Sequence, residues 1–246
     1  MENLKIGYYT LNLWDYDRIQ FPKGLPPEWK SFCICTNDAS AEQARAVGYQ
    51  EVIMLPLPVP KGLMEAIAWI SELRTSPIEP LASFDYLLYG DASLTSFSPQ
   101  QVVHAMAGFV ASEKAMMMFP RARGAPVVNQ MRVWMSFSSA RWSEVATEHE
   151  QYRDRCEIEL KTKGLALHPI DFMRSHIFAW NMRHSQRQIL VKRLTDGYKE
   201  HNNGTTIFNY MLPLWPDLIH VSPQVAMGKI DHIGGVASGK PPTPLP

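Results

Sequence analysis

Short apolar runs alternate with a helical pattern near the start of the chain. Residues 5–13 are rich in β-branched and aromatic side chains, and residues 30–35 form a second apolar run that ends in turn formers. Residues 38–48 then combine an aspartate cap at Asp38, helix-forming side chains and a terminal glycine, and a third apolar run covers residues 51–57. This strand-helix-strand succession predicts the start of an α/β domain.

The next segment predicts a helix that leads into a central strand. Apolar side chains in residues 61–74 recur at the spacing of one buried helix face, and a proline-bearing loop follows them. Residues 86–89 are then apolar without interruption and run directly into Gly90 and Asp91. Because ligands of open α/β sheets bind beyond the carboxyl ends of the strands, Asp91 is expected at a ligand-binding edge.

The rest of the chain predicts one further strand among several helices. Residues 114–119 are expected to form a strand that leads into a basic loop at residues 120–124. The expected helical segments are 98–113, 139–163 and 184–204, with a helix or a strand-helix mixture at 203–215. We expect one domain over residues 1–229 and a tail, residues 230–246, that lies over its surface because it is rich in glycine and proline.

Composition narrows the class of protein. The 246 residues contain 24 Lys and Arg against 24 Asp and Glu, so no whole-molecule field attracts nucleic acid or an anionic membrane. The cysteines are three in number, and Cys33 and Cys35 would share one strand face as packed thiols, which fits a reducing compartment. The start lacks a secretory signal, and no apolar run is long enough to span a membrane. We therefore expect a cytoplasmic protein, bacterial or in a host cell; its oligomeric state stays open.

Two short segments offer candidates for chemistry. Asp91 stands at a strand end before two small residues, so its carboxylate can approach a metal ion or a sugar hydroxyl; the alternative is an aspartate that caps the next turn. Arg121 and Arg123 are separated by one small residue and could hold a phosphate or a carboxylate. Their alternative is a solvated surface pair.

The segment from residue 231 to residue 240 offers a third set. His232 can ligate a divalent ion, the glycines after it let backbone amides approach phosphate oxygens, and Lys240 adds a positive charge. A proline follows Lys240 where a P-loop requires a helix, so a P-loop is not expected. The sequence motifs of serine hydrolases, zinc proteases and C-x-x-C redox proteins are also absent.

Several of these motifs follow one another in a known order. The first strand with residues 14–17, the proline-rich loop and the turn at residues 36–38 come first, followed by LLYGDAS at residues 87–93 and MMMFPRAR at residues 116–123. In this order they resemble the nucleotide-sugar glycosyltransferases of the A-type fold, and in particular the glycosyltransferase-like domain shared by plant cell-wall proteins and by bacterial and viral proteins. The resemblance spans most of the chain. It implies an α/β fold with a single Rossmann-like mixed sheet flanked by helices.

The resemblance also implies an activity and its residues. A sugar would pass from a nucleotide-diphosphate donor to a hydroxyl acceptor, for which a glycan is expected before protein or modified DNA. Asp91, Arg121 and Arg123 are the implied catalytic residues, since the arginines or Lys240 would stabilise the departing diphosphate. The residues implied to bind the donor nucleotide are Thr10, Asp17, Thr36, Asn37, Asp38 and Lys240.

A divalent metal ion, Mn²⁺ or Mg²⁺, is the cofactor that the resemblance implies. Asp91, Ser93 and His232 would hold it. Ser93 stands where a full D-x-D motif has its second carboxylate. Phe119 stands where the family has the histidine of a His-Pro pair, and residues 203–205 stand where the family has an R-D-Q triplet. These departures indicate a first alternative, a catalytically inactive module that binds glycan or protein. A sugar nucleotidyltransferase is the second alternative, although residues 10–18 lack the glycines that a triphosphate-binding loop needs.

Overall fold

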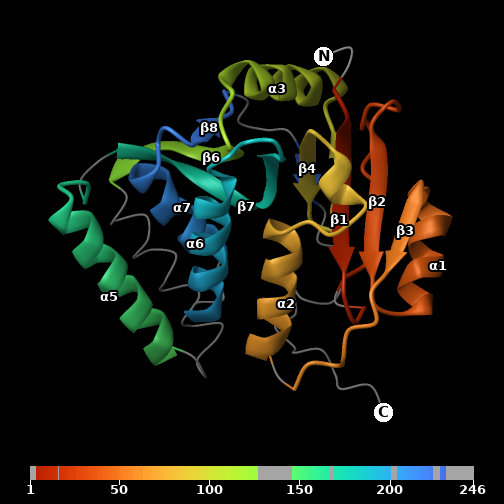
Figure 1. Ribbon diagram of the computed structural model, residues 1–246, viewed down its shortest axis with the longest axis horizontal. Coiled ribbons are helices and arrows are strands. Elements are labelled where there is room, and N and C mark those ends of the chain that lie inside the picture. Colours follow the sequence, from red (N-terminus) through yellow and green to blue (C-terminus); the bar gives the residue numbers. More distant parts are fainter. Residues whose placement is uncertain are drawn as a thin grey trace.

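A mixed sheet of seven strands forms the centre of the folded molecule (Figure 1). The computed structural model describes residues 4–15, 17–61, 63–126, 146–166, 169–200, 204–223 and 228–230. The elements of the first half are β1 (Ile6–Asn12), β2 (Lys30–Cys35), α1 (Asp38–Val47), β3 (Glu51–Met54), α2 (Leu63–Thr75), a 3-10 turn (Leu81–Ser83), β4 (Tyr86–Gly90), β5 (Leu94–Phe97), α3 (Pro99–Ser112) and β6 (Met116–Pro126). The elements of the second half are α5 (Ala146–Thr162), β7 (Pro169–Asn181), α6 (Arg187–Glu200), α7 (Gly204–Leu214), β8 (Ile219–Val221) and β9 (Gly228–Ile230).

The strand order in this sheet is β3-β2-β1-β4-β7-β6-β8. Strands β1 to β4 are parallel to one another, whereas β7 runs antiparallel to both β4 and β6. The chain leaves β1 towards β2 and β3 on one side and returns to its other side as β4, so the sheet has a topological switch point between β1 and β4. The predicted single mixed sheet flanked by helices is therefore confirmed.

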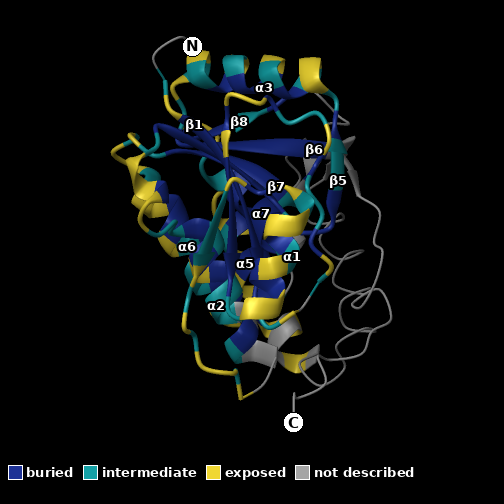
Figure 2. Cartoon of the chain, turned by 90° about the vertical axis from the view of Figure 1, so that its right-hand side faces the viewer, coloured by how far each residue is buried: buried dark blue, intermediate teal, exposed yellow. Residues whose placement is uncertain are grey.

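Each face of the sheet has its own hydrophobic core, because successive strand side chains point to opposite faces. Helices α2, α5, α6 and α7 cover the face that bears Tyr9 and Tyr89. Helices α1 and α3 cover the opposite face, which bears Tyr8 and Leu88. Figure 2 shows the strands buried between these two layers, with the exposed positions on the outer sides of the helices.

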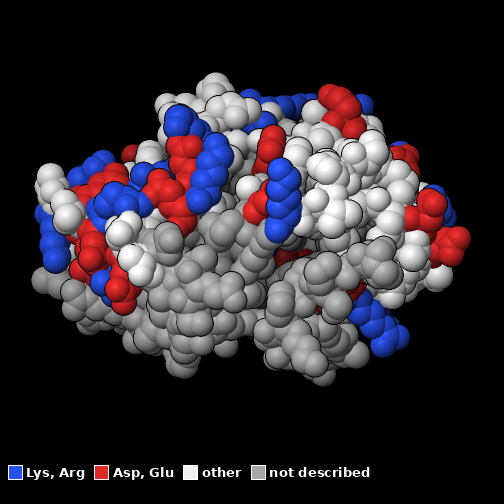
Figure 3. All heavy atoms as spheres, turned by 90° about the horizontal axis from the view of Figure 1, so that it is seen from below, with Lys and Arg blue, Asp and Glu red and all other residues white. Residues whose placement is uncertain are grey.

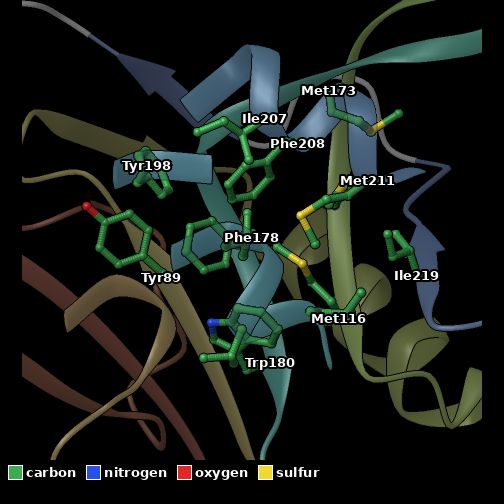
Figure 4. Packing of buried hydrophobic residues seen from close by; sticks show 14 of the residues in the cluster. Tyr89, Met116, Met173, Phe178, Trp180, Tyr198, Ile207, Phe208, Met211 and Ile219 are labelled. Atoms are coloured by element: carbon green, nitrogen blue, oxygen red, sulfur yellow. The ribbon is translucent and has the colours of Figure 1, made fainter. Parts of the chain in front are cut away.

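Aromatic side chains form the centre of the first core (Figure 4). The ring of Phe178 on β7 stacks on Tyr89 of β4, with centroids 4.9 Å apart, and lies 5.1 Å from the ring of Phe208 on α7. Trp180 packs edge-on against Phe178 at 5.8 Å. Because these residues come from β4, β7 and α7, this cluster joins the antiparallel half of the sheet to the parallel half.

Local sequence signals place the first helix and the cysteines as expected. The helix is confirmed, but its cap is Asn37 and not the predicted Asp38: the Asn37 side-chain oxygen accepts a hydrogen bond from the Ser40 backbone N–H at 2.8 Å. Gly48 ends the helix with a φ of 110°. Cys33 and Cys35 are both free and buried, and their sulfurs lie 3.6 Å apart. The prediction that they share one face as packed thiols is confirmed.

Two parts of the sheet differ from the sequence prediction. Residues 120–124 form no loop, because β6 continues to Pro126 and pairs with β7. The register shifts at Pro120, which has no N–H to donate, and pairing resumes beyond it. The small second sheet of β5 and β9 was not predicted. Residues 139–145 of the expected helix and residues 231–246 of the expected tail lie outside the described residues.

Charged side chains of both signs lie next to one another on the described part of the lower face (Figure 3). Arg193 of α6 pairs with Glu159 of α5 at 2.6 Å, and further ion pairs join Arg155 to Glu200 and Lys192 to Asp196. Lys192 and Arg193 of α6 are thus each paired with a carboxylate. None of the helices in the described ranges is both long and apolar enough to cross a membrane.

Candidate functional site

The carboxyl ends of β1 and β4 lie side by side at the switch point of the sheet. Tyr9 of β1 is the register partner of Tyr89 of β4, so β4 ends at Gly90 beside the last residues of β1. Asp91 follows directly and its backbone is fixed on both sides. Its N–H donates to the His176 carbonyl at 2.9 Å, and its carbonyl accepts from the Leu94 N–H at 2.9 Å. The predicted position of Asp91 at the end of a central strand is confirmed.

Gly90 leaves room for two side chains that pack against the end of β4. A Cβ atom at Gly90 would lie 2.7 Å from the Tyr8 hydroxyl oxygen and 2.8 Å from Cδ2 of Leu94, both inside van der Waals contact. Only glycine fits there without a shift of its neighbours. Packing thus requires a glycine at position 90, and Asp91 supplies the carboxylate at the end of the strand.

The Asp91 side chain is held by two donors on one oxygen. Oδ1 accepts a hydrogen bond from Nη2 of Arg74 at 2.7 Å and a second from the Tyr89 hydroxyl, also at 2.7 Å. Burial raises the pKa of Tyr89 well above its ordinary value, so this phenol stays protonated and donates to the carboxylate. A third of the Asp91 side chain is exposed, against 12% of the Arg74 side chain.

Arg74 reaches the site from the last turn of α2. Its Nη2 also donates to the Ser175 carbonyl at 2.8 Å, and the guanidinium lies over the Tyr89 ring, 4.6 Å from the centroid. Burial by itself would lower the pKa of Arg74, but the neighbouring oxygens of Tyr89 and Asp91 outweigh it and the pKa is raised. The guanidinium therefore remains charged beside Asp91.

Three side chains fix the end of α2 from which Arg74 projects. The Tyr9 hydroxyl and Nε1 of Trp180 both donate to the Arg74 carbonyl, the latter at 3.2 Å. Nη1 of Arg187 donates to the Thr75 carbonyl at 3.2 Å. These carbonyls belong to the last turn of the helix, where no intrahelical donor remains. Because the donors come from β1, β7 and α6, the backbone beneath Arg74 is fixed by three separate elements.

Polar side chains also gather beyond the ends of β1 and β2. The Trp14 N–H donates to Oγ1 of Thr36 at 2.7 Å, the Asp17 N–H donates to Oδ1 of Asn12 at 3.1 Å, and Nδ2 of Asn37 donates to the Asp15 carboxylate at 2.9 Å. Trp14 and Asp15 both have a φ of 54°, in the left-handed region. Consecutive residues of this kind, other than glycine, store backbone strain, which is typical of ligand-binding turns.

The structure gathers some of the predicted nucleotide-binding residues and separates others. Asp17, Thr36, Asn37 and Asp38 lie together at the ends of β1 and β2. Thr10 lies farther back along β1 and is fully buried. The backbones of Arg121 and Arg123 lie on β6, and β7 separates that strand from β4. His232 and Lys240 lie outside the described residues.

The residues described here do not fit the implied metal site. One Asp91 oxygen already accepts from a guanidinium and a phenol, and Ser93 is only 3% exposed. No group of three or more His, Cys, Asp and Glu side chains within the described ranges could hold a metal ion. A carboxylate already paired with a permanent cation is a poor partner for Mn²⁺ or Mg²⁺.

Sequence reasoning missed Arg74 as a site residue. The helical pattern placed it in the last turn of α2, where a basic side chain is favoured by the helix dipole alone. Nothing in that pattern indicates a contact with an aspartate 17 residues later. Tyr198 of α6, whose hydroxyl lies 3.5 Å from Nη1 of Arg74, had no sequence signal either.

The strand order and the polar edge at its switch point define an α/β protein of Rossmann-like architecture. No protein-family model matches the chain, and no curated protein matches it. Solved structures with a similar fold include mouse xyloside xylosyltransferase 1 in its apo form, with 9% sequence identity over 88% of this chain and 84% of that chain and a TM-score of 0.47.

Two further solved structures are similar to this chain. One is glucosyl-3-phosphoglycerate synthase from Mycobacterium tuberculosis in complex with Mn²⁺, UDP and phosphoglyceric acid, at 14% identity over 89% of this chain and 68% of that chain, with a TM-score of 0.46. The other is CMP:2-keto-3-deoxy-manno-octonic acid synthetase in complex with CTP, at 10% identity over 93% of each chain, with a TM-score of 0.47.

Proposed function

We propose that this protein is a glycosyltransferase that moves a sugar from a nucleotide-diphosphate donor to a hydroxyl acceptor. The observation that carries the proposal is the position of Asp91, a partly exposed carboxylate immediately after β4 at the switch point of the sheet. Ligands of open α/β sheets bind in the crevice outside such strand ends. A carboxylate there accepts hydrogen bonds from the hydroxyl groups of a ribose or a sugar.

The ends of β1 and β2 would receive the nucleoside. Asp17, Thr36, Asn37 and Asp38 offer oxygen and amide groups at this edge, and the strained turn at residues 14–15 lies between the two strand ends. Hydrogen bonds to a base and a ribose need fixed donors and acceptors of this kind, because each unmatched polar group lowers affinity. The acceptor is proposed to be a carbohydrate.

Stabilisation of the departing diphosphate needs positive charge. Arg121, Arg123 and Lys240 remain our candidates for this role from the sequence. A preorganised cation in a partly dry site lowers the barrier by several kcal/mol in enzymes of many kinds. The loop after β1 favours glycosyl over nucleotidyl transfer, because residues 13–18 contain no glycine and a triphosphate-binding loop needs glycines that let backbone amides approach the phosphates.

Nucleotide binding tests the proposal directly. Thermal-shift and calorimetric titrations with UDP, GDP, CDP and ADP should show stabilisation by at least one of them, and Asp91→Asn should remove it. Asp154→Asn is the matched control, because Asp154 pairs with Arg153 on the surface of α5, 61% exposed and away from the strand ends. No response to any of these nucleotides would contradict the proposal.

Donor hydrolysis separates an active enzyme from an inactive binding module. A glycosyltransferase releases some nucleoside diphosphate by transfer of the sugar to water, and Asp91→Asn should reduce that release. Nucleotide binding without any hydrolysis of the matching nucleotide sugar would favour the inactive module. Release of pyrophosphate from a nucleoside triphosphate and a sugar phosphate would instead indicate a nucleotidyltransferase.

A further inference from the structure

Arg74 occupies one side of the Asp91 carboxylate. Oδ1 of Asp91 receives both the Arg74 guanidinium and the Tyr89 hydroxyl at 2.7 Å, and a carboxylate oxygen has two in-plane lone pairs. That oxygen is therefore saturated. Bidentate ligation of a metal ion by Asp91, which needs both oxygens, would require the loss of these two hydrogen bonds.

Contacts of the guanidinium and of the backbone beneath it hold Arg74 beside Asp91. Its Nη2 also donates to the Ser175 carbonyl, its face lies on the Tyr89 ring, and its backbone carbonyl accepts from Trp180 and Tyr9. Its raised pKa keeps it charged at every physiological pH. A divalent ion on Asp91 would therefore be bound next to a permanent positive charge that is only 12% exposed.

The residues that follow Asp91 do not supply a second ligand. The Leu94 N–H closes a turn onto the Asp91 carbonyl, and within this turn Ala92 and Ser93 are 3% exposed each. The Gln20 N–H further holds the Ala92 carbonyl at 2.8 Å. Asp91 is thus the one carboxylate that this turn presents to a ligand.

We propose that Asp91 binds its ligand as a hydrogen-bond acceptor for hydroxyl groups and not as a metal ligand, and that Arg74 is the positioning residue that fixes this carboxylate in place of a metal ion. Oδ1 is used within the protein, and Oδ2 accepts from the ribose or sugar hydroxyl. Arg74 acts through Asp91 and the Tyr89 ring. The identity of the ligand rests on the function proposed above, whereas the exclusion of metal from Asp91 is independent of it.

A titration with Mn²⁺ alone tests the exclusion of metal. Binding is followed by the electron paramagnetic resonance signal of free Mn²⁺, for the wild-type chain, Asp91→Asn and the surface control Asp154→Asn. We expect the same Mn²⁺ binding for all three proteins. A wild-type site that disappears in Asp91→Asn, but not in the control, would overturn the proposal whether or not a nucleotide binds.

Nucleotide binding by the single and double variants tests the positioning role of Arg74. For any nucleoside diphosphate that binds, Arg74→Met should weaken binding, and the addition of Asp91→Asn to Arg74→Met should weaken it much less than Asp91→Asn does in the wild-type chain, because Arg74 acts through Asp91. Additive losses would mean that Arg74 does not act through Asp91, and this part of the proposal would then be wrong.

Nucleotide titrations test the hydrogen-bonding role. For any nucleoside diphosphate that binds, Asp91→Asn should weaken binding about tenfold or more, the effect of one lost charge-assisted hydrogen bond. The loss should be equal in EDTA and in Mn²⁺. A loss seen only with Mn²⁺ would overturn the inference, and no binding in either condition would count against the proposed function while the Mn²⁺ titration still decides the role of Asp91.

Discussion

Asp91→Asn is expected to destabilise the protein more than Arg74→Met, although the two side chains form one ion pair. The difference follows from what each change leaves behind. Without the aspartate charge, a permanent cation that is 12% exposed loses its counterion, and water cannot replace it. Without the arginine, the remaining carboxylate is 33% exposed and can be hydrated, and it still accepts from the Tyr89 hydroxyl.

The expected magnitudes follow from the same contacts. Removal of one partner of a buried pair costs about 3–5 kcal/mol, and we expect about 3 kcal/mol for Asp91→Asn because the amide oxygen still accepts from Arg74. Arg74→Met loses the bond to the Ser175 carbonyl and the contact with the Tyr89 ring, for which we expect about 1–2 kcal/mol in total. The double variant should cost about 2 kcal/mol, which leaves a coupling of about 2–3 kcal/mol between the two residues.

Urea unfolding of the wild type, both single variants and the double variant measures this cycle. The four transitions should have the same slope against urea concentration, so that shifts in midpoint report stability alone. A coupling below about 0.5 kcal/mol would refute the reasoning, because residues that share no interaction add within that range. A larger loss for Arg74→Met than for Asp91→Asn would also refute it, since it would mean that Asp91 is the less hydrated partner.

Two further predictions concern residues outside the ion pair. Gly90→Ala should cost about 1–3 kcal/mol in thermal or urea unfolding, since its Cβ would lie 2.7 Å from the Tyr8 hydroxyl, and Tyr8→Phe in the same chain should recover part of the loss. The control Gly108→Ala on helix α3 should cost nothing, because the nearest atom to its Cβ, Nε2 of His220, would lie 3.7 Å away. Burial and, to a smaller extent, the positive charge of Lys114 lower the pKa of His220 below its ordinary value of 6.5. As the pH falls, the unfolded chain therefore protonates this histidine at a higher pH than the folded chain does. Stability should therefore fall as the pH is lowered through 6.5 towards the lowered pKa, and His220→Gln should remove that part of the slope in unfolding measured between pH 5 and pH 8; an unchanged slope would contradict the prediction.

The parallel half of the fold could be predicted from the sequence because its signals are local. Buried parallel strands are continuous apolar runs, and the first helix has a capping residue at Asn37 and a terminal glycine at Gly48. The extension of β6 could not be predicted, because Pro120 and Gly124 are typical of loops and only the pairing with β7 overrides them. The β5 strand was missed for the same reason, as its partner β9 lies at the other end of the chain.

One part of the candidate site could likewise be predicted from the sequence, and another part could not. Asp91 was predictable because the end of an apolar strand and a small-residue turn are both visible within a few positions. Its environment was not, because the Arg74 guanidinium reaches it from α2 and is held there by Ser175, which is 101 residues away along the chain. Metal ligation by Asp91 was predicted from this residue alone, without Arg74. A guanidinium beside the carboxylate disfavours the binding of a divalent cation there.

Stability alone does not account for a buried cation at the switch point. An ion pair of this kind contributes little net stability compared with apolar side chains of similar volume, since both charges must leave water. The double variant Arg74→Met/Asp91→Asn separates the two roles. It should be more stable than Asp91→Asn alone, because the unpaired charge is gone, yet it should bind nucleotide no better than Asp91→Asn. If binding instead recovers together with stability, Asp91 supports the fold and is not the group that contacts the ligand.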